Sequence, residues 1–123
     1  MSRVFKIHGP TLFFAVLIFV LSSIPNLRPP VLIITIKDVW AHFAEYLIFA
    51  YFLQRSCRDL YGSRLNVVVL GIVLGILYGA SDEFHQLFVK NRMATLPDFI
   101  ADSFGILLGT TIFVLKKNKN NFF

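Results

Sequence analysis

Ionisable and polar residues recur at helical spacing inside apolar stretches of this 123-residue chain. One such group is at i, i+4, i+7 and i+8, and consists of Asp38, His42, Glu45 and Tyr46. A second group follows the same helical rule with Asp98, Asp102, Gly105 and Gly109. In the stretch "YGASDEFHQLF", Tyr78, Asp82, His85 and Gln86 share a face, with Glu83 on its flank. Each spacing places its group on one side of a helix.

Carboxylates and histidines gathered in this way are suited to proton transfer and to ligand binding. We expect the groups that transfer protons to be Glu83, His42 and Asp98. We expect the ligand-binding residues to be Gln86, Arg92, Asp102, Asp38, Glu45, Tyr46, Asp82 and His85. The guanidinium of Arg92 has the fork geometry that binds a phosphate or carboxylate through two hydrogen bonds.

Three other interpretations of these residues stay open. His42, Glu45, Glu83, His85, Asp98 and Asp102 offer nitrogen and oxygen ligands for zinc, iron or manganese. Their spacing is not that of a known metal motif, so no metal or other cofactor is assigned. A proton or ion path is disfavoured because the other halves of the same helices carry almost no ionisable groups. In the third interpretation, an Arg92–Asp98 pair and amide–acid hydrogen bonds only fasten helix ends together.

The composition indicates where these groups lie. Hydrophobic residues make up 56% of the chain and charged residues 15%, and the mean hydropathy is +0.69. A soluble domain this small would not bury so much apolar surface. Four apolar segments, about 8–25, 38–54, 65–88 and 96–115, approach the roughly 20 residues that span a bilayer as a helix. We therefore predict an all-α fold: a single domain, residues 1–123, forming an integral membrane four-helix bundle.

The basic residues predict the orientation of this bundle. Arg3, Lys6, Arg55, Arg58, Arg64, Lys116, Lys117 and Lys119, eight in all, fall on one side. Arg28, Lys37, Lys90 and Arg92, four in all, fall on the other. The positive-inside rule therefore places both termini in the cytoplasm and the polar groups in the outward half. A cleaved signal peptide is disfavoured, because "VLSS" makes a poor cleavage site.

Glycines predict how the helices meet. Gly71, Gly75 and Gly79 repeat every four residues in the third segment, and Gly105 and Gly109 do so in the fourth. Small residues at this spacing let helix backbones approach closely. We expect the third and fourth helices to pack through these faces, with their acids adjacent.

Two classes of function are set aside. The net charge is +5, but the basic residues lie between and beyond the apolar segments, which fits membrane topology rather than nucleic-acid binding. The single cysteine, Cys57, excludes an intrachain disulfide and a cysteine cluster for zinc.

The motif positions together resemble the VanZ-like membrane proteins. The residues that carry this resemblance are Glu83, Gln86, Arg92, Asp98, Asp102, Gly105 and Gly109, with the second-helix group and "SSIP" at 22–25. The founding member is associated with resistance to the glycopeptide teicoplanin. The resemblance implies a multi-pass protein of the bacterial cytoplasmic membrane, surrounded by the lipid bilayer. We expect it to bind, and in an extended role to process, an anionic or lipid-linked envelope component. The alternative is a non-catalytic protein whose polar cluster serves helix packing or partner assembly.

Overall fold

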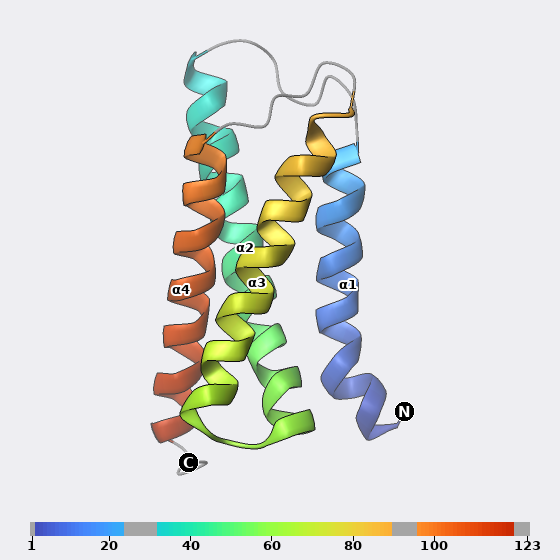
Figure 1. Cartoon of the computed structure of the whole chain (residues 1–123), viewed down its shortest axis with the longest axis vertical. Coiled ribbons are helices and arrows are strands. Elements are labelled where there is room, and N and C mark those ends of the chain that lie inside the picture. The colour runs from blue at the N-terminus through green and yellow to red at the C-terminus, as the bar shows by residue number, and fades with distance from the viewer. Residues whose placement is uncertain (1, 24–31, 90–95, 120–123) are drawn as a thin grey trace.

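The computed structural model describes residues 2–23, 32–89 and 96–119, and these residues form four helices with no strand among them. The helices are α1 (Arg3–Ser23), α2 (Leu32–Tyr61), α3 (Leu65–Gln86) and α4 (Leu96–Lys119). They run alternately up and down, so the start of α1, the turn between α2 and α3, and the end of α4 lie at one end (Figure 1). The all-α prediction is confirmed.

A short turn reverses the chain between α2 and α3. Gly62 follows the last residue of α2 with a φ of 95°, a left-handed conformation that glycine adopts without strain. Its N–H donates to the carbonyl of Arg58 at 2.8 Å, which satisfies an orphan acceptor of the last helical turn. This turn allows α2 and α3 to pack as antiparallel neighbours.

Three of the helices are long and apolar enough to cross a membrane. Among the described residues these are Arg3–Ser23, Leu65–Gln86 and Leu96–Lys116. α2 does not reach the same hydropathy, because it carries polar and ionisable residues on its inward face and at its ends. Its crossing of the membrane, and the side on which the termini lie, stay predictions.

α2 and α4 come closest through the glycines of α4. A Cβ atom added to Gly105 would lie 2.5 Å from the carbonyl oxygen of Phe43. A Cβ atom added to Gly109 would overlap the carbonyl oxygen of Leu47. The prediction that these two glycines face the third helix is therefore wrong: they face the backbone of α2. The reason is that spacing defines a face of a helix but not the neighbour that covers it.

The glycines of α3 contact side chains instead of backbone. Gly75 lies against Ile106 of α4, and Gly79 lies against Asp102 of α4 and Tyr46 of α2. The prediction that α3 and α4 bring their acids together is confirmed, because Glu83 and Asp102 belong to one compact cluster of side chains. α3 therefore rests on the paired helices α2 and α4.

Polar contacts attach α1 to the rest of the bundle. Near the end where α1 begins, the guanidinium of Arg3 and the imidazole of His8 both contact the carboxylate of Asp59 on α2. One turn further along, Thr11 Oγ1 lies 2.7 Å from Ser56 Oγ. These contacts fix the register of α1 against α2.

We expect Gly105→Ala to reduce stability, because the new methyl group would meet backbone that has no room to move. Overpacking of this kind costs about 1–3 kcal/mol. Gly9→Ala on α1 is the matched control, since its Cβ would meet only the Phe5 ring at 3.7 Å. The free energies of unfolding can be compared by titrating the protein from mild detergent into SDS and following helical circular dichroism. Equal stabilities for the two variants would contradict the close α2–α4 contact.

Asp59 should make the attachment of α1 dependent on pH. Desolvation acts to raise the pKa of Asp59, but the hydrogen bond and charge of His8 and the charge of Arg3 outweigh it and lower the pKa. A lowered native pKa means that the stabilisation is fully present above the ordinary value of about 3.8 and is lost as the pH falls through the native pKa, which lies below that value. Asp59→Asn should thus lower the melting temperature more at about pH 7 than at about pH 3. A difference of the same size at both pH values would contradict this assignment.

Candidate functional site

Four ionisable side chains from three helices converge between α2, α3 and α4. We call His42, Asp82, Glu83 and Asp102 the polar cluster; one nitrogen or oxygen of each lies within 4.8 Å of those of the others. All four side chains are buried, and Asp102 is fully so. The helical faces predicted from spacing bring them together, since α2 supplies His42, α3 supplies Asp82 and Glu83, and α4 supplies Asp102.

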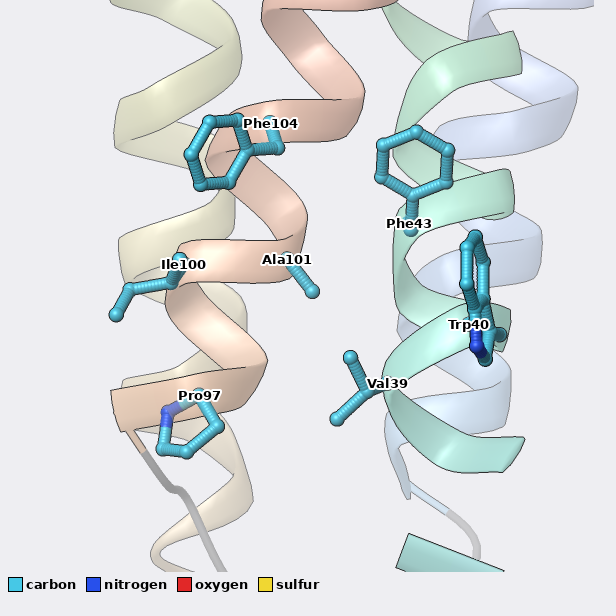
Figure 2. Close-up of a pocket in the computed structure, with 7 residues that line it drawn as sticks. All are labelled: Val39, Trp40, Phe43, Pro97, Ile100, Ala101 and Phe104. Carbon is cyan, nitrogen blue, oxygen red and sulfur yellow. The ribbon is translucent and has the colours of Figure 1, made fainter. Parts of the chain in front are cut away.

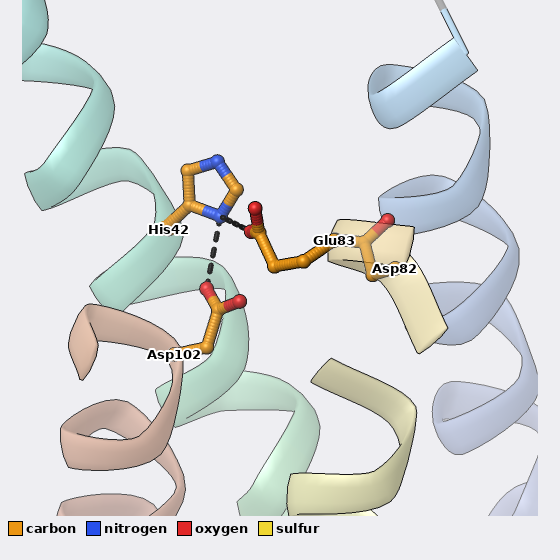
Figure 3. Close-up of side chains that lie close together, drawn as sticks. All are labelled: His42, Asp82, Glu83 and Asp102. Atoms are coloured by element: carbon orange, nitrogen blue, oxygen red, sulfur yellow. Dashed lines mark hydrogen bonds and ion pairs between the residues drawn. The ribbon is translucent and has the colours of Figure 1, made fainter. Parts of the chain in front are cut away.

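His42 is at the centre of the contacts within the cluster. Its Nδ1 lies 2.9 Å from Oδ1 of Asp102 and 3.8 Å from Oε1 of Glu83. Figure 3 shows Glu83 extending from α3 toward the imidazole, which also faces Asp102 on α4. One ring nitrogen therefore connects carboxylates from two different helices. Glu83, predicted to lie on the flank of its helix, points into the cluster.

A second set of hydrogen bonds surrounds the cluster. Tyr46 donates its hydroxyl to Oδ2 of Asp82 at 2.9 Å, which links α2 to α3. The amide nitrogen of Gln86 donates to Ser22 Oγ at 3.3 Å, which links α3 to α1. Tyr46 and Gln86 were predicted to bind a ligand, and both lie fully buried beside the cluster. Their side-chain donors are directed to protein acceptors.

His85 lies apart from the cluster, on the side of α3 that faces α1. Its Nε2 is 2.9 Å from Ser23 Oγ, and its ring stacks on Phe19 with 4.7 Å between centroids. Tyr78 also turns to α1, where its hydroxyl donates to the carbonyl of Ala15. Tyr78 and His85 were predicted to share a face with Asp82. Instead, Tyr78 and His85 contact α1, whereas Asp82 contacts Tyr46 of α2.

The remaining predicted residues occupy different positions. Asp98 is buried one helical turn before Asp102, and Glu45 is half-buried on α2. Asp38 lies in α2, but its side chain is outside the described residues, as is the whole of Arg92. The Arg92–Asp98 pair therefore stays a prediction.

Gln54, which was not among the predicted site residues, makes a further polar link deeper in the bundle. It is fully buried and donates to the carbonyl of Val68 at 2.9 Å and to Thr110 Oγ1 at 3.2 Å. Gln54 follows Tyr46 by eight residues, so extending the polar face of α2 by two turns would have found it.

The polar cluster is strongly acidic. It combines three carboxyl groups with a single imidazole, and Asp98 adds a fourth carboxyl group nearby. Neither oxygen of Glu83 nor Oδ2 of Asp102 has a hydrogen-bond partner among the described residues. Such oxygens can accept a hydrogen bond, carry a proton or coordinate a cation. The donor set of one imidazole and three carboxylates is also one that binds zinc or manganese.

An apolar groove runs between α2 and α4 at the same level along these helices as the cluster. We call it the α2–α4 groove; it has a volume of about 460 Å³ and is lined by Val39, Trp40, Phe43, Pro97, Ile100, Ala101 and Phe104. Figure 2 shows that α2 and α4 provide its two walls. Phe43 follows His42 in the chain, and Ala101 precedes Asp102. The groove and the polar cluster therefore occupy the same turns of the same two helices.

Comparison with known proteins confirms the predicted family resemblance. No curated protein and no solved structure matches the chain. The family VanZ/LLP1 matches residues 12–117, a range that includes the polar cluster, the α2–α4 groove and most of all four helices. The chain belongs to the VanZ/LLP1 family.

Proposed function

We propose that this membrane protein binds a lipid-linked component of the bacterial cell envelope, with the lipid chain in the α2–α4 groove and the polar part directed to the polar cluster. The observation that carries the proposal is the position of the groove, whose walls share helical turns with His42 and Asp102. The volume of about 460 Å³ is within the usual range for small-molecule sites. Every lining residue is apolar, as a hydrocarbon chain requires.

The charge of the cluster favours one kind of polar group. Its buried carboxylates accept hydrogen bonds, so hydroxyl and amide groups of a sugar or peptide are suitable partners. An anion would be repelled by the same carboxylates unless Arg92 or a bound cation neutralised it. Of the anionic and lipid-linked ligands expected from the sequence, the lipid-linked class is the better supported.

Processing of the bound component would begin with proton transfer. His42 Nδ1 and Asp102 Oδ1, 2.9 Å apart, are close enough to exchange a proton between α2 and α4, and Glu83 Oε1 of α3 lies 3.8 Å from the same nitrogen. Asp98, one turn from Asp102, would serve as a further carboxyl group at this site. In a bacterial cell, binding of an envelope precursor would alter susceptibility to teicoplanin.

A second candidate is a purely structural role in helix packing or partner assembly. The hydrogen bonds Tyr46–Asp82 and Gln86–Ser22 favour it, since each fastens two helices together. Oxygens without a hydrogen-bond partner argue against it, because a fastening cluster gains nothing from acceptors that are left unused.

Filling the groove should weaken binding of a lipid-linked ligand. Trp40 is the only tryptophan and lies on the groove wall, so its fluorescence reports occupancy. The purified protein in detergent would be titrated with a polyprenyl alcohol and with a polyprenyl phosphate, both in the presence of a chelator. We expect Ala101→Leu to weaken binding about tenfold or more, because a side chain of three extra carbons replaces a methyl group on the groove wall. Ala80→Leu, on the exposed face of α3, is the matched control and should bind as the parent does. Equal binding by both variants would contradict the proposal.

Glu83→Gln separates the two candidates, because it removes a charge while keeping the shape of the side chain. If the cluster contacts the polar part of a ligand, this variant should bind the polyprenyl alcohol several-fold more weakly at an unchanged melting temperature. If the cluster only fastens helices, Glu83→Gln should weaken binding only to the extent that it also lowers the melting temperature and so the amount of folded protein. Both quantities are measured on the same purified sample.

A further inference from the structure

The polar cluster brings together a set of atoms that resembles a coordination sphere. One imidazole nitrogen and three carboxylate oxygens, from three helices, lie within 4.8 Å of one another (Figure 3). In a metal site with bonds of about 2.1 Å, adjacent ligand atoms are roughly 3.0–3.4 Å apart. The distances from His42 Nδ1, 2.9 Å to Asp102 and 3.8 Å to Glu83, fall on either side of this range. The four atoms are all within 4.8 Å of one another, so the carboxylates would have to turn toward a common point to complete the sphere.

The charge of the cluster requires a counterion or protons. All four side chains are at least nine-tenths buried, where an unpaired carboxylate is costly. The basic residues whose side chains the structure describes belong to the start of α1, the end of α2, the start of α3 and the end of α4, whereas the cluster lies toward the start of α2 and α4 and the end of α3; they are Arg3, Lys6, Arg55, Arg58, Arg64 and Lys116. Among the described side chains, His42 is thus the one group within the cluster that can carry positive charge.

Individual atoms also point to a missing partner. Oε1 and Oε2 of Glu83 and Oδ2 of Asp102 are buried and lack a hydrogen-bond partner among the described residues. Asp102 is 0% exposed and Glu83 is 8% exposed, so bulk water does not satisfy them. Buried polar atoms of this kind call for an explanation, and a bound ion is one.

We propose that His42, Asp82, Glu83 and Asp102 together bind one divalent transition-metal ion, of the class of Zn2+ or Mn2+. Nδ1 of His42 supplies the nitrogen ligand, and the three carboxylates supply the oxygens. Tyr46 is a positioning residue, because its hydroxyl holds the carboxylate of Asp82 at 2.9 Å. The metal site stands on this geometry and does not depend on the lipid proposed above.

Metal binding would also deepen the proposed function, and this consequence rests on that proposal. A divalent cation reverses the local electrostatics of a carboxylate cluster. A headgroup such as a phosphate would then be attracted to a site that otherwise repels it. The metal would thus extend the range of lipid-linked ligands from neutral to anionic headgroups.

The metal content of the purified full chain tests the site directly. The protein in detergent is stripped with a chelator, incubated with Zn2+ or Mn2+, desalted and analysed by mass spectrometry for metal per chain. We expect the parent to bind about one equivalent of metal per chain. Asp102→Asn and Glu83→Gln should each lower the metal affinity about tenfold or more, and Tyr46→Phe should lower it about tenfold. Asp59→Asn is the matched control, since Asp59 lies 17 residues from His42 along α2, about 25 Å away. It should retain the metal.

A second measurement does not depend on the folding of any variant. The electron paramagnetic resonance spectrum of Mn2+ should broaden on addition of the parent protein, and an excess of Zn2+ should restore the free spectrum. Less than about a tenth of an equivalent of metal in the parent, or equal metal in the parent, Asp102→Asn and Glu83→Gln, would overturn the proposal. Because the lipid titration is done with a chelator present, its outcome and that of the metal measurement are independent.

Discussion

The contact between the glycine face of α4 and the backbone of α2 determines where the polar cluster forms. Gly105 lies against the carbonyl of Phe43, one residue after His42 in the chain. Because this contact leaves no room for a side chain, the two helices are held at one distance and one register. His42 then faces Asp102, three residues before Gly105, at hydrogen-bonding distance. The chemistry of the cluster therefore depends on a contact made by a residue that has no side chain.

Burial of the cluster is hard to explain by stability alone. Ionisable groups removed from water lose hydration, and replacing them by apolar residues is often neutral or stabilising. The bundle has an apolar core for cohesion, formed by Ile18, Tyr46, Phe49, Ala50 and Ile106. The cluster adds three carboxyl groups at the same junction of helices, although hydrogen bonds such as Gln54–Thr110 could join helices without any charge. Ionisable residues at membrane depth are accordingly taken to indicate function.

Sequence periodicity predicted the inward faces well, because a bilayer penalises any polar side chain that turns outward. His42, Tyr46, Asp82, Gln86, Asp98 and Asp102 are all buried, as their spacing implied. Periodicity did not predict which helix each face would meet. His85 turned to α1, and the glycines of α4 turned to α2, because those choices depend on packing across the whole bundle. The bounds of α2 also differed: it begins at Leu32 and ends at Tyr61, since a helix continues past its apolar stretch into polar residues.

The two sides of the cluster are covered differently, and this asymmetry favours access from lipid. On the side of α1, polar groups are already engaged, through Gln86 with Ser22 and His85 with Ser23. Between α2 and α4, the surface is an apolar groove whose lining includes Ala101, the residue before Asp102. An apolar surface favours a hydrocarbon chain over a water-soluble ligand, in agreement with the lipid-linked ligand proposed above. α1 therefore covers one side of the cluster with polar contacts and leaves the apolar face between α2 and α4 for the proposed ligand, although α1 contributes no residue to the cluster.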